Sequence, residues 1–149
     1  NIMLQTILAI SGKPGLYKLV SRAKASLIVE ILDETHKRIP AFASDRVTSL
    51  ADIAMYTYED DVPLMTILAS LRDKEEGKEA SINYKKASGA ELQEYFAAIL
   101  PNFDRERVHT SDIKKLIQWY NILVKAGVTD FEDALAPTEG NNIDDRNAE

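Results

Sequence analysis

The segment 10–20 is the first stretch whose composition suggests chemistry, because ISGKPGLYKLV places two glycines and a proline around a lysine. A nucleotide-binding loop of the Walker type needs G-x-x-x-x-G-K-[ST] between a strand and a helix, where backbone N–H groups surround the phosphates. Here Gly12 is followed directly by Lys13, and the residues after Gly15 have the pattern of a strand. The segment therefore predicts a turn with Pro14 and Gly15 at its second and third positions.

Residue types that support catalysis or metal binding are scattered along the chain. His36 and His109 have no cluster of ligand-type residues nearby, and a zinc-type site needs three or four converging ligands. There is no cysteine, no G-x-S-x-G and no H-E-x-x-H. We therefore expect a protein that is not an enzyme, with no catalytic residues, no cofactor and no metal site.

Aromatic and basic side chains suggest binding. The two-residue period of a strand places Tyr56 and Tyr58 on one face, close to loops that carry lysine and arginine. Such a pair can stack on a ligand or enclose a cation, or it can simply pack on the helix that follows. The candidate residues for binding a protein or peptide are Lys13, Tyr17, Lys37, Arg38, Arg46, Tyr56 and Tyr58.

A second set of candidates lies on the last predicted helix. Lys114, Lys115 and Gln118 lie off its apolar stripe, where the recognition helix of a nucleic-acid-binding protein carries its contacts. Trp119 is expected to pack between helices. These three polar residues are the candidate contacts of the alternative hypothesis, in which the protein binds RNA or DNA.

The net charge of −6 is distributed unevenly. Residues 1–58 carry seven Lys and Arg against five Asp and Glu, and residues 59–129 carry ten against twelve. Residues 130–149 carry one against seven, so this end of the chain holds the acidic excess. An acidic chain therefore argues only weakly against a polyanionic partner.

Short β-branched and aromatic runs in the first third of the chain predict strands. They cover residues 6–10, 15–20, 26–32, 37–42 and 52–58. Five short strands in an open sheet leave exposed edges, and closure into a barrel removes them. We therefore predict an α+β protein whose residues 3–58 form a small five-stranded antiparallel SH3-like barrel.

The hydrophobic period changes to 3.6 residues after Asp61. Helices are predicted at 62–74, 89–100 and 111–126. The second begins with a capping box, Ser88 and Glu91, and ends before Pro101. Residues 59–135 thus form a three-helix C-terminal domain, and residues 136–149, which contain almost no large apolar side chain, are expected to be a disordered acidic tail.

The strings ISGKPGLYKLV, LIVEILD, DIAMYT with VPL, LPNFDRERV and DIKKLIQWYNILVKAGVTDF support a family assignment. Over about residues 3–131 the chain resembles a family of uncharacterised two-domain bacterial proteins known as domains of unknown function. The resemblance implies an SH3-like N-terminal barrel joined to a helical C-terminal domain. It implies no activity and no site residues.

No apolar run approaches the ~20 residues that cross a bilayer, and the N-terminal residues lack the pattern of a signal peptide. We therefore expect a cytoplasmic protein with no membrane partner. Its predicted function is that of a non-enzymatic binding or adaptor module. A protein or peptide partner would bind at the loop end of the barrel and in the groove between the two domains.

Overall fold

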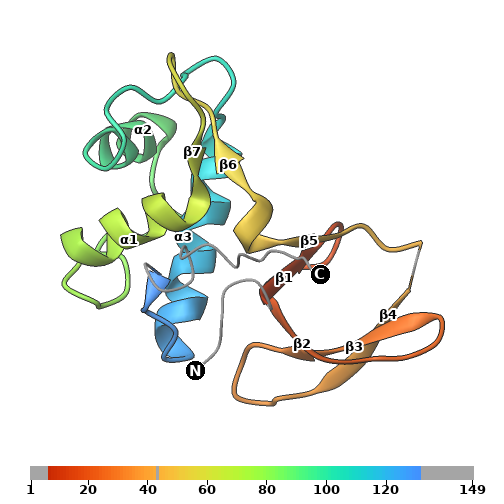
Figure 1. The fold of residues 1–149 in the computed structure, drawn as a ribbon. Coiled ribbons are helices and arrows are strands. Elements are labelled where there is room, and N and C mark those ends of the chain that lie inside the picture. Colours follow the sequence, from red (N-terminus) through yellow and green to blue (C-terminus); the bar gives the residue numbers. More distant parts are fainter. Residues whose placement is uncertain (1–6, 43, 132–149) are drawn as a thin grey trace.

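The computed structural model describes residues 7–42 and 44–131. The described chain has the predicted α+β class, with a five-stranded antiparallel sheet, a two-stranded sheet and three helices. The five-stranded sheet lies on one side of the molecule, and the helices lie on the other with the small sheet (Figure 1). Residues 136–149, the predicted disordered tail, lie outside the described residues.

The large sheet has the strand order β4-β3-β2-β1-β5. Its strands are β1 (Ile7–Ile10), β2 (Tyr17–Arg22), β3 (Ser26–Ile31), β4 (Arg38–Phe42) and β5 (Val47–Ser49). The loop between β1 and β2 contains a hydrogen-bonded turn from Ile10 to Lys13, with Gly12 at its third position and a φ of 82°. Gly15 also has a positive φ, so this loop uses both glycines for backbone geometry.

The predicted closure into a barrel is wrong. Among the described residues no ladder joins β4 to β5, which are the two edges of the sheet, and a hollow of about 400 Å³ is lined by Ala41 and Phe42 of β4 and Val47 of β5 together with residues near the β2–β3 connection. Strand β5 has only three residues, and its pairing with β1 uses all of them. The sheet is therefore curled but open at this edge.

The predicted fifth strand, residues 52–58, is also placed differently. The fifth strand of the sheet is instead β5, which lies in a segment where no strand was predicted. A 3-10 turn, η2 (Leu50–Asp52), follows it. The chain then forms β6 (Ala54–Met55), which pairs with β7 (Val62–Pro63). Met55 is buried in the same cluster as the helices, so hydrophobic contact with the helices holds this segment away from the large sheet.

The three predicted helices are confirmed as α1 (Leu64–Lys74), α2 (Gly89–Ala97) and α3 (Thr110–Lys125). The capping box of α2 is present, since the Ser88 hydroxyl accepts from the Glu91 N–H at 3.1 Å and the Glu91 carboxylate accepts from the Ser88 N–H at 2.8 Å. At the start of α3 the Asp112 carboxylate accepts from the His109 N–H. These caps fix where α2 and α3 begin.

Two hydrophobic clusters lie on opposite faces of the large sheet. The larger one joins the helices to one face of the sheet through Ile7, Leu16 and Leu50, which are at most 1% exposed. The smaller one lies in the curl of the sheet and includes Leu8 and Val29. Alternate residues of β1 thus enter different clusters.

No helix among the described residues has the length and the apolar character that a membrane span requires.

Candidate functional site

A hollow of about 550 Å³ lies between the loop end of the large sheet and α3. Its walls come from β1, the β1–β2 loop, β5 and one side of α3. The side chains that give it chemical character are Lys13, Arg46, Lys115, Gln118 and Trp119. We call it the basic hollow. The sequence placed four of these residues in two separate hypotheses, and the structure brings them together at one site.

The basic hollow has an uncompensated positive charge. No Asp or Glu lines it, and none of its three cations, Lys13, Arg46 and Lys115, forms an ion pair within the part of the chain that the structure describes. Cations in a concave surface focus the local potential and attract anions. The hollow is therefore suited to carboxylate or phosphate groups.

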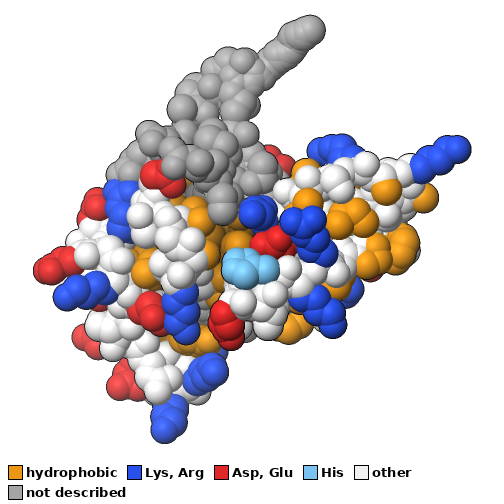
Figure 2. Space-filling view, turned by 90° about the horizontal axis from the view of Figure 1, so that it is seen from below, with side chains coloured by type: hydrophobic (Ala, Val, Ile, Leu, Met, Phe, Trp, Pro, Cys, Tyr) orange, Lys and Arg blue, Asp and Glu red, His pale blue; other side chains and the backbone are white. Residues whose placement is uncertain are grey.

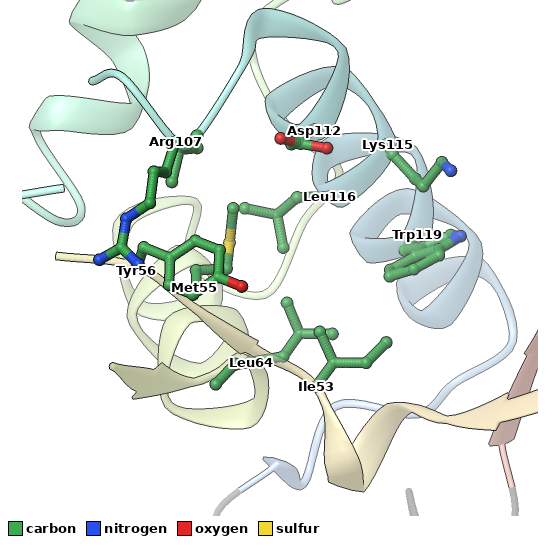
Figure 3. Close-up of a pocket in the computed structure, with 11 residues that line it drawn as sticks. Ile53, Met55, Tyr56, Leu64, Arg107, Asp112, Lys115, Leu116 and Trp119 are labelled. Carbon is green, nitrogen blue, oxygen red and sulfur yellow. The ribbon is translucent and has the colours of Figure 1, made fainter. Parts of the chain in front are cut away.

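An apolar pocket of about 190 Å³ adjoins the basic hollow (Figure 3). Met55, Leu64 and Leu116 provide its apolar surface. Ile53, Lys115 and Trp119 line both spaces. The two spaces therefore share a wall and form one groove along α3. One end is mostly apolar, with Arg107 and Asp112 also in its lining, and the other end is cationic.

Tyr56 lines the apolar pocket, and it is exposed together with Tyr58. Both tyrosines contact the loop between α2 and α3. The Arg107 guanidinium lies 4.1 Å from the centroid of the Tyr56 ring, and the Arg105 N–H donates to the Tyr58 hydroxyl at 3.1 Å. The rim of the apolar pocket therefore carries the Tyr56 ring next to Arg107 (Figure 3).

Asp104 fixes the position of Arg107 on this rim. Its Oδ2 accepts from Arg107 Nε at 2.9 Å, and its Oδ1 accepts from the backbone N–H groups of Glu106 and Arg107. The hydrogen bond from the Arg107 side chain, together with these backbone bonds, lowers the pKa of Asp104 even though its partial burial opposes this. The carboxylate thus stays ionised and holds the arginine against Tyr56.

Tyr17 is not available to a partner, contrary to the prediction. It is 5% exposed, belongs to the cluster inside the curl of the sheet, and donates its hydroxyl proton to the Pro14 carbonyl at 3.1 Å. Burial raises the pKa of Tyr17. The side chain packs beneath the β1–β2 loop and thereby supports the position of Lys13 from the inside.

Three other candidates lie away from the groove. Lys37 lies in the connection between β3 and β4, Arg38 is the first residue of β4, and Lys114 is exposed on α3. None of them lines the basic hollow or the apolar pocket. On the face drawn in Figure 2, Lys and Arg side chains lie over both the sheet and the helices, whereas acidic side chains lie mostly over the helices. The basic character of the sheet thus extends beyond the groove.

Arg38 contributes to an ionic cluster around Glu30. This glutamate is 7% exposed, its Oε2 lies 2.9 Å from His36 Nδ1, and its Oε1 accepts from Arg38 Nε at 3.3 Å. The hydrogen bond with His36, followed by those with Arg38 and the charge of Lys18, lowers the pKa of Glu30 against the opposing effect of burial. This cluster stabilises the β3–β4 connection.

The sequence missed Ile53, Met55 and Trp119 as site residues. Trp119 is half-buried on the side of α3 that faces the sheet, where it lines both parts of the groove. Trp119 lies off the apolar stripe like its neighbour Gln118, but the sequence led us to expect it between helices and not at a binding site. Ile53 has no such local signal, because only the turn η2 places it beside α3.

Comparison with known proteins places the chain in a family. Residues 4–50 match the model of a domain of unknown function (DUF5606), and residues 53–123 match that of a second (DUF6852). A solution NMR structure of a protein from Bacteroides vulgatus, a structural genomics target, is 63% identical, with a TM-score of 0.73. The similarity covers 87% of this chain and 91% of that one. No curated protein matches. The chain belongs to a bacterial family of unknown function that joins these two domains.

Proposed function

We propose that the protein is a non-enzymatic binding module that holds an extended acidic segment of a protein partner in the groove between the large sheet and α3. The observation that carries this proposal is the wall of Ile53, Lys115 and Trp119, which joins the apolar pocket to the basic hollow. An apolar side chain of the partner enters the pocket, and the carboxylates that follow it along the partner lie in the hollow. A cytoplasmic location remains part of this proposal.

The size and chemistry of the two spaces support a peptide ligand. A pocket of about 190 Å³ accommodates one large apolar side chain, whose burial contributes about 1.5–3 kcal/mol. Each solvent-exposed ion pair contributes about 1 kcal/mol or less, and salt weakens it. The expected binding is therefore reversible and salt-dependent, with apolar contact as the larger contribution.

The test uses a fluorescein-labelled peptide with one leucine followed by two aspartates, and measures fluorescence anisotropy with the full chain. Lys115→Glu reverses a charge that lines both spaces and is expected to lower the affinity about tenfold. Lys114→Glu is the matched control, since it makes the same change one residue earlier at an exposed position outside the groove.

The control should leave the affinity within about twofold of the wild-type value. Circular dichroism confirms that both variants are folded. Equal losses in the two variants would show a general effect of net charge and overturn the proposed site. A peptide with asparagines in place of its aspartates should bind more weakly, and equal affinity for both peptides would also contradict the proposal.

RNA or DNA is the second candidate ligand. Lys13, Arg46 and Lys115 line the same hollow as Trp119, and this resembles the combination of charge and stacking that binds single strands. A nucleic-acid strand would leave the apolar pocket unfilled, however, so we favour the peptide as the ligand. A random single-stranded oligonucleotide at low salt tests the alternative: binding that falls steeply with added salt would support it, and no anisotropy change would exclude it.

A further inference from the structure

We propose that residues 132–149 of this chain occupy the same groove in the free protein and compete with the partner. Ile143 would enter the apolar pocket, and Asp144 and Asp145 would lie in the basic hollow. The inference rests on the proposed function, because it assigns an intramolecular ligand to the same groove.

Charge complementarity is the first argument. Residues 132–149 contain six acidic residues and one arginine. The basic hollow presents Lys13, Arg46 and Lys115, and residues 7–42 and 44–131 contribute no carboxylate to its lining. The acidic residues near the end of the chain and the cationic lining of the basic hollow are thus complementary in charge, and both belong to one molecule.

The order of residues is the second argument. Ile143 is followed immediately by Asp144 and Asp145. The groove has the same order, because the apolar pocket and the basic hollow share the wall of Lys115 and Trp119. Adjacent residues of an extended chain can therefore reach both spaces without a spacer.

Reach is the third argument. Phe131, the last described residue, packs on α3, with its ring centroid 6.5 Å from that of Tyr120. Tyr120 is the residue after Trp119, and an α-helix with its side chains is only about 10–12 Å across. The twelve residues 132–143 can span up to roughly 40 Å when extended, which is ample to pass around the helix. A tethered segment also has an effective concentration of about millimolar, so weak contacts suffice to fill the groove.

The experiment uses Trp119, the single tryptophan of the chain, as a reporter inside the groove. Acrylamide quenching of its fluorescence is measured in the full chain and in the full-chain variant Asp144→Asn/Asp145→Asn. If the segment covers Trp119, quenching should rise by about twofold in the variant, and the difference should vanish in about 1 M salt, where charges are screened. The matched control Asn141→Ser/Asn142→Ser should behave as wild type.

Equal quenching in the wild-type protein and the Asp144→Asn/Asp145→Asn variant would overturn the inference. Quenching of the wild-type protein that changes with protein concentration would also overturn it, because the segment would then come from a second copy. The labelled leucine–aspartate peptide separates this inference from the proposed function. Removal of the internal competitor should raise the affinity for that peptide about threefold.

If the peptide binds the two proteins equally and quenching is unchanged, the internal ligand is excluded and the proposed function stands. If the peptide binds neither protein, the proposed function fails, and the quenching result alone decides whether the segment occupies the groove.

Discussion

The Arg107 guanidinium lies 4.1 Å from the centroid of the Tyr56 ring, at the rim of the apolar pocket. Asp104 holds the arginine in place through an ion pair at 2.9 Å, and the Asp104 backbone N–H donates to the Tyr56 carbonyl. The loop between α2 and α3 and the segment after β6 are thereby joined through both side chains and backbone. The shape of the rim depends on this contact.

Replacing Tyr56 by leucine should remove the cation–π contact while keeping an apolar side chain at the rim. Such contacts contribute about 0.5–1 kcal/mol at exposed sites, so the free energy of unfolding should fall by about that amount. Urea denaturation measures it. Tyr58→Phe is the control, because it removes only an exposed hydrogen bond with the Arg105 N–H. A larger loss in the control than in Tyr56→Leu would contradict the assignment.

Phe96→Ala should strongly destabilise the helical core. The ring is fully buried and forms an edge contact with Phe103 at 4.9 Å between centroids. Truncation of a buried phenylalanine costs about 3–5 kcal/mol, through lost burial and the cavity that remains. Phe42→Ala, at a position that is 51% exposed, should cost under about 1 kcal/mol in the same urea titration. Similar costs for both variants would show that the burial of Phe96 is wrongly described.

Glu30 should make the stability of the sheet depend on pH. Its pKa is lowered in the folded state by His36, Arg38 and Lys18, so folding favours the ionised form. The stabilisation is present above the unfolded glutamate pKa of about 4.3 and is lost as the pH falls through the lower, folded value. Denaturation at a series of pH values should show Glu30→Gln less stable than wild type at neutral pH. That difference should shrink under acid, and a constant difference would contradict the role of charge.

The hydrogen bond from Tyr95 to Glu75 should stabilise the packing of α2 against the end of α1. Burial favours the neutral form of Glu75, but the hydrogen bonds that its carboxylate accepts from Ser81 and Tyr95 outweigh burial and lower the pKa of Glu75. Burial, together with the hydrogen bond to Glu75, raises the pKa of Tyr95. Hydrogen bonds to charged groups contribute about 1.5–3 kcal/mol, and partial exposure reduces this, so Tyr95→Phe should cost about 1 kcal/mol.

Tyr84→Phe is the control for that measurement, because the Tyr84 hydroxyl has no hydrogen bond within residues 7–42 and 44–131. It should leave the denaturation midpoint nearly unchanged. If Tyr95→Phe behaves in the same way as this control, the bond to Glu75 contributes nothing measurable.

The helices could be read from the sequence because their signals are local. The capping box of Ser88 and Glu91 and the apolar stripe of α3 each lie within a few turns of chain, and they determine where these helices begin and which face is buried. The end of α2 differs from the prediction by three residues: the helix ends at Ala97, and the N–H groups of Ile99 and Leu100 both bond to the Phe96 carbonyl in the turns that follow.

The sheet could be read only in part because strand pairing depends on distant residues. Residues 52–58 alternate in a way that is typical of a strand, yet the burial of Met55 among the helices decides their position. The short β5 has no hydrophobic run, and its pairing with β1 alone defines it.

The residue types that line the groove could be recognised in the sequence, but their proximity in space could not. Exposed cations such as Lys13, Arg46 and Lys115 were recognised singly. No local pattern shows that a loop near residue 13 lies beside a helix near residue 115. Burial of Ile7 and Leu50 against the helices creates that proximity, and with it the basic hollow.

The alternation along β1 has a consequence for how the two family domains unfold. Ile7 belongs to the cluster shared with the helices, and Leu8 belongs to the cluster within the sheet. Separation of the chain at the boundary between the two family models, residues 50 and 53, would expose Ile7, Leu16 and Leu50 to water. The sheet and the helices are therefore expected to lose their structure in one cooperative transition, so that two units recognised separately by sequence form a single thermodynamic domain.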